Sequence, residues 1–165
     1  MSEYEYPGGE LALFAHARNW KSYFAERLRP HVRGAVLEVG AGMGETTTAL
    51  WHGGVSSWTC LEPDPTLASA IDRAASALTA RGATVKVQAC TTGELESSAR
   101  FDTILYVDVL EHIAEDRAEL ARAAAHLAPG GRLVVLSPAH QKLFTPFDAA
   151  IGHHRRYSAE TLSAL

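Results

Sequence analysis

The chain is poor in cysteine and has no long apolar run, and both shortages limit what it can be. Cys60 and Cys90 are the two cysteines among its 165 residues, too few and too separated for a disulfide framework or a zinc site. No apolar run approaches the roughly 20 residues of a membrane span, and the acidic, polar start at 1–5 is no signal peptide. We therefore expect a cytoplasmic protein with reduced thiols.

The chain also lacks an excess of positive charge. Its formal net charge is −4 and its pI is about 6.0, which gives it no general attraction to nucleic acid or to anionic membranes. Large polyanions are therefore not expected as substrates, although a local basic patch could select a small anion. The hydrophobic content of 47% is enough to build one domain with a sizeable core.

Segments with the pattern of strands alternate with segments of helical spacing. Strands are predicted at 35–39, 57–62, 84–88, 101–107 and 133–136, and helices at 11–28, 45–51, 65–80 and 111–127. Asp64 and Pro65 fit the cap and the first position of a helix, and 129–131 (Pro-Gly-Gly) is predicted to end the last helix. This alternation predicts an α/β fold with a parallel sheet and right-handed crossovers.

The strand at 35–39 runs directly into a turn with three alternate glycines. Glycine tolerates positive φ and leaves no side chain in the way of a ligand. A dinucleotide-binding fingerprint would place its third glycine at position 45, but this residue is Glu45. Glu38 and Glu45 would repel a phosphate and would suit a ligand with an ammonium group and no phosphate, such as S-adenosylmethionine (SAM). This pattern disfavours a nicotinamide-dependent oxidoreductase.

A second acid follows the next predicted strand. Glu62 lies 18 residues beyond Gly44, where an acid at the tip of the neighbouring parallel strand can accept hydrogen bonds from ribose hydroxyls. Taken alone, Glu62 would be interpreted as a solvated residue at a strand end. The glycine turn before it favours the ribose role.

Several motifs together resemble those of class I SAM-dependent methyltransferases. Glu38-x-Gly40-x-Gly42-x-Gly44 matches their motif E/D-x-G-x-G-x-G, and 101–113 and 127–133 match the series F-D-x-I, V-L-E-H-I and L-x-P-G-G-x-L of many small-molecule methyltransferases. The resemblance implies a Rossmann-like, doubly wound parallel sheet with the strand order 3-2-1-4-5. The family generally has seven strands, so this chain would lack the usual last two.

The resemblance also implies a set of cofactor-binding positions, with SAM as the cofactor. Val107 and Asp108, after the fourth strand, would border the methionine moiety. Relatives usually have an adenine-binding acid after the third strand, but this chain has 89–92 (Ala-Cys-Thr-Thr) there. Trp20 either covers the cofactor or packs its helix on the sheet. The predicted cofactor-binding residues are Trp20, Glu38, Gly40, Ala41, Gly42, Gly44, Glu62, Pro63, Cys90, Thr91, Val107 and Asp108.

The loop after the fifth strand is expected to face the methyl acceptor, because loops at the carboxyl ends of parallel strands line the ligand crevice. Its segment 148–158 is similar to a D-x-x-x-G-H-x-R-R-Y-S/T segment of some bacterial methyltransferases, including ones associated with glycosyltransferases. His153 and His154 are candidate general bases. The candidate acceptor-binding residues are His140, Arg155, Arg156 and Tyr157, which would suit an acidic or glycan-related small molecule.

Plainer interpretations compete with these roles. One of the two arginines could pair with Asp148 as a structural clamp, and His112 could make a structural hydrogen bond. No metal site is expected, since His140, His153, His154 and Asp148 lack a regular ligand spacing. Glu119 and Arg122 are expected to form an exposed helical pair.

The chain is predicted to form a single domain over 1–165. A helical segment (1–30) precedes the cofactor-binding core (35–137), and the acceptor loop with the start of a helix (138–165) follows. Without further strands the domain would be incomplete at its C-terminal end, and the apolar edge at 133–136 would invite self-association. The sequence thus predicts a SAM-dependent methyltransferase acting on a small-molecule acceptor. The alternative is a SAM-binding module without catalysis.

Overall fold

The computed structural model describes residues 16–80 and 82–165. In this part of the chain five strands form one sheet, all neighbours parallel, in the order β3-β2-β1-β4-β5. The strands are β1 (Gly34–Val39), β2 (Val55–Leu61), β3 (Val85–Gln88), β4 (Phe101–Val107) and β5 (Leu127–Leu136). The predicted strand order 3-2-1-4-5 is therefore confirmed, and with it the Rossmann-like α/β fold.

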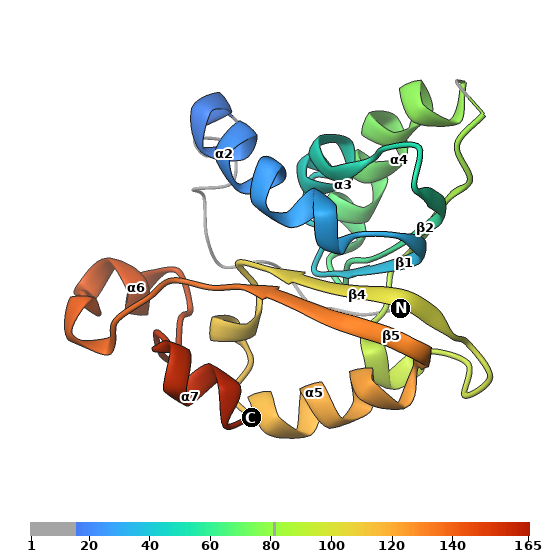
Figure 1. The fold of residues 1–165 in the computed structure, drawn as a ribbon. Helices are drawn as coiled ribbons and strands as arrows, with labels where there is room; N and C mark the ends of the chain where they lie inside the picture. The colour runs from blue at the N-terminus through green and yellow to red at the C-terminus, as the bar shows by residue number, and fades with distance from the viewer. Residues whose placement is uncertain (1–15, 81) are drawn as a thin grey trace.

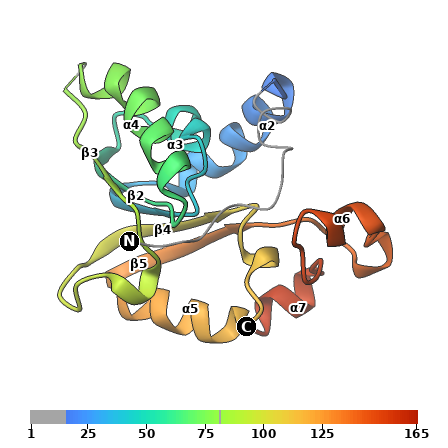
Figure 2. The same ribbon diagram turned by 180° about the vertical axis from the view of Figure 1, so that it is seen from behind.

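Helices cover both faces of the sheet. Figure 1 shows α2 (Arg18–Leu28), α3 (Glu45–Leu50) and α4 (Pro65–Thr79) on one face and α5 (Asp116–Ala125) and α7 (Ala159–Ser163) on the other, and Figure 2 shows the same layers from behind. The remaining short elements are the 3₁₀ turns η1 (Arg29–His31), η2 (Thr92–Glu94), η3 (Leu110–His112) and η4 (Gln141–Leu143), and α6 (Pro146–Ala150). This is the doubly wound arrangement that the sequence predicts.

Alternate residues of β1 supply the two halves of the core. Val36 packs with Phe24 of α2 and Ile71 of α4. Its neighbour Leu37 points to the opposite face, where Ala123 of α5 and Tyr157 belong to the same buried cluster. Because each large apolar side chain stabilises the fold by about 1.5–3 kcal/mol when buried, these two clusters hold the helices on the sheet.

The strand register brings the carboxyl ends of four strands to one edge. Val39 pairs with Leu61 of β2 and with Tyr106 of β4, and Val107 pairs with Leu136 of β5. The residues that follow these strands are the glycine turn, Glu62, Asp108 and Ser137. Ligands of open α/β sheets bind at this edge.

The helices differ from their predicted bounds in two places. The helix predicted at 11–28 is α2 from Arg18 onward, and positions 11–15 lie outside the described residues. The helix predicted at 111–127 is wrong in its first turn, which is the separate 3₁₀ turn η3, and α5 begins at Asp116. The carbonyl groups of Ile113 and Ala114 accept hydrogen bonds from the Arg155 guanidinium at 3.2 and 2.8 Å, a distant contact that a local pattern cannot reveal.

Strand β5 begins six residues earlier than predicted, because Pro-Gly-Gly (129–131) lies within it. Phe101 pairs with Leu127 and Thr103 pairs with Arg132, so the longer segment of β5 bulges between these two pairs. Gly130 has φ +75°, and a Cβ on Gly131 would lie 3.0 Å from the Phe101 carbonyl oxygen. The glycines therefore permit a bulge in the strand.

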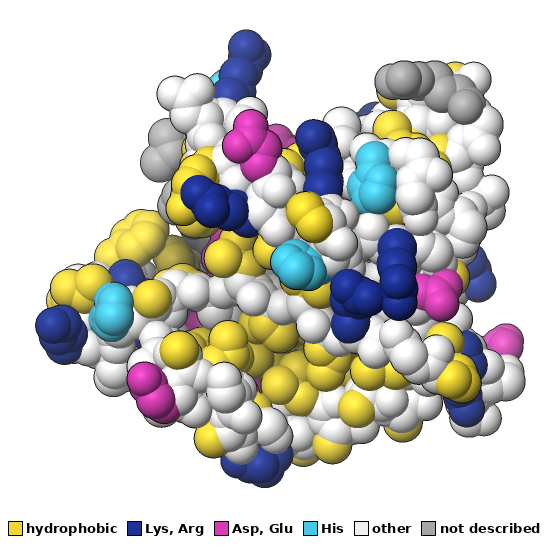
Figure 3. Space-filling view, viewed as in Figure 1, with side chains coloured by type: hydrophobic (Ala, Val, Ile, Leu, Met, Phe, Trp, Pro, Cys, Tyr) yellow, Lys and Arg dark blue, Asp and Glu magenta, His cyan; other side chains and the backbone are white. Residues whose placement is uncertain are grey.

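Strand β5 is, with β3, one of the two edge strands of the sheet in the described part of the chain. Its residues 131–136 are half-buried, and Figure 3 shows hydrophobic side chains gathered on the face between β5 and α5. Self-association through this edge stays a prediction. Within residues 16–80 and 82–165, no helix has the length and apolar character needed to cross a bilayer.

Candidate functional site

Two cavities meet at the carboxyl edge of the sheet. The first, of about 600 Å³, lies between α2, the ends of β4 and β5, and the loop around α6. The second, of about 800 Å³, lies beside the end of β2, η2 and the start of α5. Both cavities are lined by Gly40, Gly42, Asp108 and His112, so these four residues form the wall between them.

The three glycines of the turn after β1 have different roles in packing and in access to the cavity. Each has a positive φ, of 66° at Gly40, 55° at Gly42 and 80° at Gly44. A Cβ on Gly40 would lie 2.6 Å from Val109, and one on Gly44 would lie 3.2 Å from Ile71, so these two glycines allow close packing. A Cβ on Gly42 would meet nothing within 4 Å, which leaves Gly42 facing the space where a ligand can approach.

Glu38 is not placed as predicted. Its carboxylate is 2% exposed and accepts hydrogen bonds from the Thr47 hydroxyl at 2.5 Å and from the Trp58 indole at 2.7 Å. Neither cavity is lined by Glu38 or by Gly44. Burial raises the pKa of Glu38 to about 7. The carboxylate ties α3 to β1 and β2 and so fixes the glycine turn from behind, instead of meeting a ligand's ammonium group.

Glu62 lies where the sequence predicts an acid. Its side chain lines the second cavity and accepts hydrogen bonds from the backbone N–H of Gly42 at 2.8 Å and of Asp64 at 3.0 Å. Burial raises its pKa above the usual range. Pro63, Cys90 and Thr91 line the same cavity. Each Glu62 oxygen retains acceptor capacity for a ligand hydroxyl.

The second cavity also contains an acid that the sequence analysis misread. Glu119 is buried, and it accepts hydrogen bonds from Thr92 at 2.8 Å, Tyr106 at 2.6 Å and Arg122 at 2.8 Å. The predicted exposed pair with Arg122 is therefore wrong, since one member lies inside. The spacing of Glu119 and Arg122 on a helix is compatible with an exposed pair and also with a pair that has one buried member.

Aromatic and charged side chains of α2 line the first cavity. Trp20 is 43% exposed, stacks on Tyr23 and meets Phe24 edge-on, with both ring distances at 5.9 Å. Phe24 is buried and packs in the core, so Trp20 is left on the cavity wall. Lys21, which the sequence analysis did not single out, forms an ion pair with Glu45 at the same wall. This ion pair offsets part of the repulsion that is expected between the Glu45 carboxylate and a phosphate.

Val107 and Asp108 lie at the end of β4, as predicted. Val107 lines the first cavity and Asp108 lines both. Asp108 has φ +53°, a strained conformation for a residue other than glycine. Burial raises its pKa to about 6, and the nearby His153 opposes this shift.

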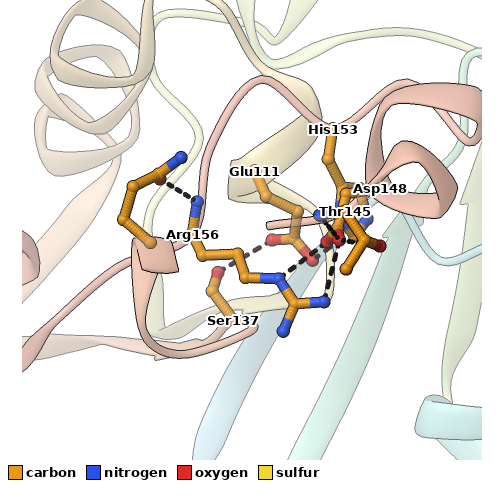
Figure 4. A network of polar contacts seen from close by, with 7 residues as sticks. Glu111, Ser137, Thr145, Asp148, His153 and Arg156 are labelled. Carbon is orange, nitrogen blue, oxygen red and sulfur yellow. Dashed lines mark hydrogen bonds and ion pairs between the residues drawn. The ribbon is translucent and has the colours of Figure 1, made fainter. Parts of the chain in front are cut away.

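Asp148 organises the loop beyond β5, and Figure 4 shows its side chain between Thr145, His153 and Arg156. It accepts hydrogen bonds from Thr145 at 2.8 and 2.9 Å, from His153 Nδ1 at 3.0 Å, and from two nitrogens of Arg156 at 2.7 and 2.9 Å. The Arg156 guanidinium is the main cause of the lowered pKa of Asp148. Arg156 is thus the clamp, the plainer of its two interpretations, while it also lines the first cavity.

Glu111 is a buried acid on the opposite side of His153. It has no exposed surface, and its Oε2 accepts a hydrogen bond from the Ser137 hydroxyl at 2.8 Å. Its Oε1 lies 3.9 Å from His153 Nε2 and has no hydrogen-bond partner among the described residues. Burial raises the pKa of Glu111 to about 7. The sequence pattern places Glu111 at a helix start and gives no sign of this role.

The other predicted acceptor residues are dispersed. His154 is exposed and lines the second cavity rather than the first. Arg155 pairs with Asp116 at 2.5 Å, and the Tyr157 hydroxyl donates to the same carboxylate at 2.9 Å. His140 is exposed, has φ +63° and lines neither cavity. These contacts give Arg155 and Tyr157 structural roles, and neither residue lines either cavity. Their contact with the acceptor stays a prediction.

The sheet order, the glycine turn and the acid after β2 define a Rossmann-like ligand-binding domain. The chain belongs to the methyltransferase domain family, whose model matches residues 12–165. This membership supports the class I methyltransferase resemblance.

Solved structures share the fold. A SAM-dependent methyltransferase from Clostridium acetobutylicum is 17% identical, with a TM-score of 0.61 over 81% of this chain and 56% of that chain. The YcgJ protein from Bacillus subtilis is 18% identical, with a TM-score of 0.66 over 89% and 65%. The DhpI protein in a complex with SAM is 21% identical, with a TM-score of 0.64 over 81% and 59%.

A curated relative matches one short stretch of the chain. The ubiquinone biosynthesis O-methyltransferase of Bradyrhizobium sp. (strain ORS 278) is 47% identical over 47 residues, which are 28% of this chain and 19% of that protein. The chain therefore spans less than two thirds of the length of each of these relatives.

Proposed function

We propose that this domain transfers a methyl group from SAM to a small-molecule acceptor. The observation that carries the proposal is the pair of cavities that meet at the glycine turn. An elongated ligand lying across their shared wall would have its adenosine in the second cavity and its methionine end in the first. Family membership supports the same cofactor.

The residues of the second cavity suit a nucleoside. Glu62 would accept hydrogen bonds from the ribose hydroxyls, and its bond to the Gly42 N–H couples that contact to the turn. Cys90 and Thr91 would border the adenine, in the position where relatives have an acid. Asp108, Gly40 and the ion pair of Lys21 with Glu45 would surround the charged methionine end.

The rest of the first cavity would hold the acceptor. Its wall combines the apolar side chains of Phe24, Leu136, Phe147 and Ile151 with Ser137, His153 and Arg156. Because Asp148 already engages two nitrogens of Arg156, this guanidinium has fewer donors left for an acidic acceptor. A small, partly apolar molecule with a hydroxyl group fits this wall better, and the O-methyltransferase activity named for the curated relative agrees with it.

In the proposed reaction, an acceptor lone pair attacks the sulfonium methyl carbon in line with the breaking carbon–sulfur bond. The electrons of that bond pass to sulfur and yield neutral S-adenosylhomocysteine. The acceptor loses its proton to His153 or to water. Orientation and exclusion of water in the cavity would supply much of the acceleration.

Calorimetric titration of the 165-residue chain with SAM, S-adenosylhomocysteine and NAD tests the proposal. We expect both adenosyl ligands to bind and NAD not to bind. NAD binding without SAM binding would overturn the proposal. If SAM binds but no S-adenosylhomocysteine forms with any of a panel of small phenols and sugars, the chain would be a SAM-binding module without catalysis.

A further inference from the structure

Three potential metal-ligating side chains converge in the wall of the first cavity. Glu111 and His112 come from η3, which follows β4, and His153 comes from the loop after α6. The ligand atoms of these residues all lie within 4.8 Å of one another, and all three residues line the cavity. The rings of His112 and His153 meet edge-on with centroids 4.5 Å apart.

The contacts of Glu111 and His153 leave two acceptor atoms facing each other. Asp148 accepts bonds from Thr145 and Arg156 and therefore acts as a carboxylate toward His153 Nδ1, 3.0 Å away. A carboxylate accepts only, so Nδ1 carries a proton, and in the neutral imidazole, the form that binds metal ions, Nε2 presents its lone pair. That lone pair lies 3.9 Å from the buried Glu111 Oε1, which has no hydrogen-bond partner in the described chain. A cation between the two atoms would satisfy both.

We propose that Glu111, His112 and His153 bind one divalent transition-metal ion. Two imidazoles and one carboxylate suit ions such as Zn²⁺, Co²⁺ or Mn²⁺ better than ions that prefer oxygen ligands alone. Asp148 would be the outer carboxylate that orients His153, an arrangement common for metal-bound histidines. Ligand atoms about 2.1 Å from one tetrahedral ion lie about 3.4 Å apart. Ligand atoms that now lie as far as 4.8 Å apart would therefore have to approach each other by roughly 1 Å or more on binding.

The proposed ion would face the part of the first cavity that is proposed to hold the acceptor, and it could therefore activate an acceptor hydroxyl. Three protein ligands leave coordination positions open toward the cavity, where an acceptor hydroxyl could bind and lose its proton more readily. The proton would then pass to water, because His153, with Nδ1 on Asp148 and Nε2 on the ion, could not accept it. This consequence rests on the proposed methyl transfer, whereas ion binding itself does not.

Titration of the chelator-treated 165-residue chain with Co²⁺ tests the proposal. We expect one ion per chain, visible absorption bands of bound Co²⁺, and competition by Zn²⁺. Glu111→Gln and His153→Asn should each weaken binding at least tenfold. Asp148→Asn should weaken it about tenfold. The matched control is His31→Asn, which changes an exposed histidine on η1 and should leave binding unchanged.

Two results would overturn the proposal. One is the absence of binding of Co²⁺, Zn²⁺ and Mn²⁺ at millimolar concentration. The other is unaltered binding in folded Glu111→Gln and His153→Asn variants, with folding checked by thermal unfolding; if one variant fails to fold, the other decides. Binding of S-adenosylhomocysteine is measured separately on the ion-free chain. A failure of cofactor binding can therefore be distinguished from a failure of ion binding.

Discussion

Glu38 and Glu62 show what the sequence can and cannot assign to a single residue. Glu38 lies on β1, and Glu62 directly follows the neighbouring parallel strand β2. The carboxyl ends of these strands meet, and this topology was enough to place Glu62 at the second cavity. The partners of Glu38 come from 9 and 20 residues along the chain, through Thr47 on α3 and Trp58 on β2. A local motif cannot reveal such partners, so the buried role of Glu38 was missed.

At Glu62 we predict a loss of cofactor affinity on substitution. Glu62→Ala removes a proposed charge-assisted contact to the ribose, which should cost about 1.5–3 kcal/mol of binding free energy for S-adenosylhomocysteine. Calorimetry measures this change. Glu26→Ala, at an exposed position of α2, is the control and should bind as the parent chain does. Equal affinities for all three proteins would remove Glu62 from the site.

At Glu38 we predict a pH-dependent stability. Its pKa is about 7 in the folded protein and near 4.5 without burial. Between these values the folded chain keeps a proton that the unfolded chain has lost. The stabilisation is thus complete below about pH 4.5 and declines as the pH rises to about 7, by about 1.4 kcal/mol per pH unit or about 3 kcal/mol in total.

Glu38→Gln should reduce the decline by about 3 kcal/mol, because glutamine does not titrate. The part of the decline that comes from the raised pKa values of Asp108 and Glu111 should remain. The measurement is the free energy of unfolding in urea at pH 5 and at pH 7.5 for both proteins. Glu26→Gln serves as the control at an exposed carboxylate and should follow the parent profile. Parallel profiles for the parent chain and Glu38→Gln would contradict the raised pKa.

At the scale of elements, the sheet could be predicted well and the connections less well. Apolar runs and glycine turns predict strands that are buried on both faces. The strand order was implied by the family resemblance, and the structure confirms it. The start of α5 could not be predicted, because its preceding carbonyls bind Arg155, 41 and 42 residues later. The three-residue cluster in the first cavity was missed for the same reason, as η3 and the loop after α6 meet only in the fold.

The turn after β1 yields a matched pair of substitutions. Gly42 and Gly82 both have positive φ, of 55° and 86°, and a Cβ on either would meet nothing within 4 Å. Alanine at each position should therefore destabilise the fold similarly, by about 1–2 kcal/mol for the left-handed backbone. We expect Gly42→Ala alone to lose S-adenosylhomocysteine binding, because its methyl group enters the cavities.

Unfolding curves of both glycine variants measure their stability, and calorimetry measures their affinity for S-adenosylhomocysteine. Gly82→Ala corrects for the backbone cost, since Gly82 follows α4 and lines neither cavity. Unchanged affinity in Gly42→Ala would mean that the ligand does not approach this turn. Equal losses in both variants would assign the effect to stability instead.

At the scale of the whole molecule, we expect the exposed side of β5 to govern how the 165-residue chain behaves in solution. A strand at the edge of a sheet presents unpaired backbone groups, and Leu133 on β5 is only half-buried. A half-buried apolar side chain lacks part of the roughly 1.5–3 kcal/mol of stabilisation that full burial would contribute. We therefore predict that this chain self-associates through β5 as its concentration rises.

Sedimentation velocity over a hundredfold range of concentration tests this association. Leu133→Lys places a charge on the edge strand and should shift the chain toward monomer, because charged residues blunt edge-to-edge pairing. Leu143→Lys is the control, since Leu143 is 51% exposed on η4, away from the edge strand. The free energy of unfolding of both variants is measured to separate association from misfolding. A parent chain that stays monomeric and thermally stable at the highest concentration would show that β5 is protected by a contact other than self-association.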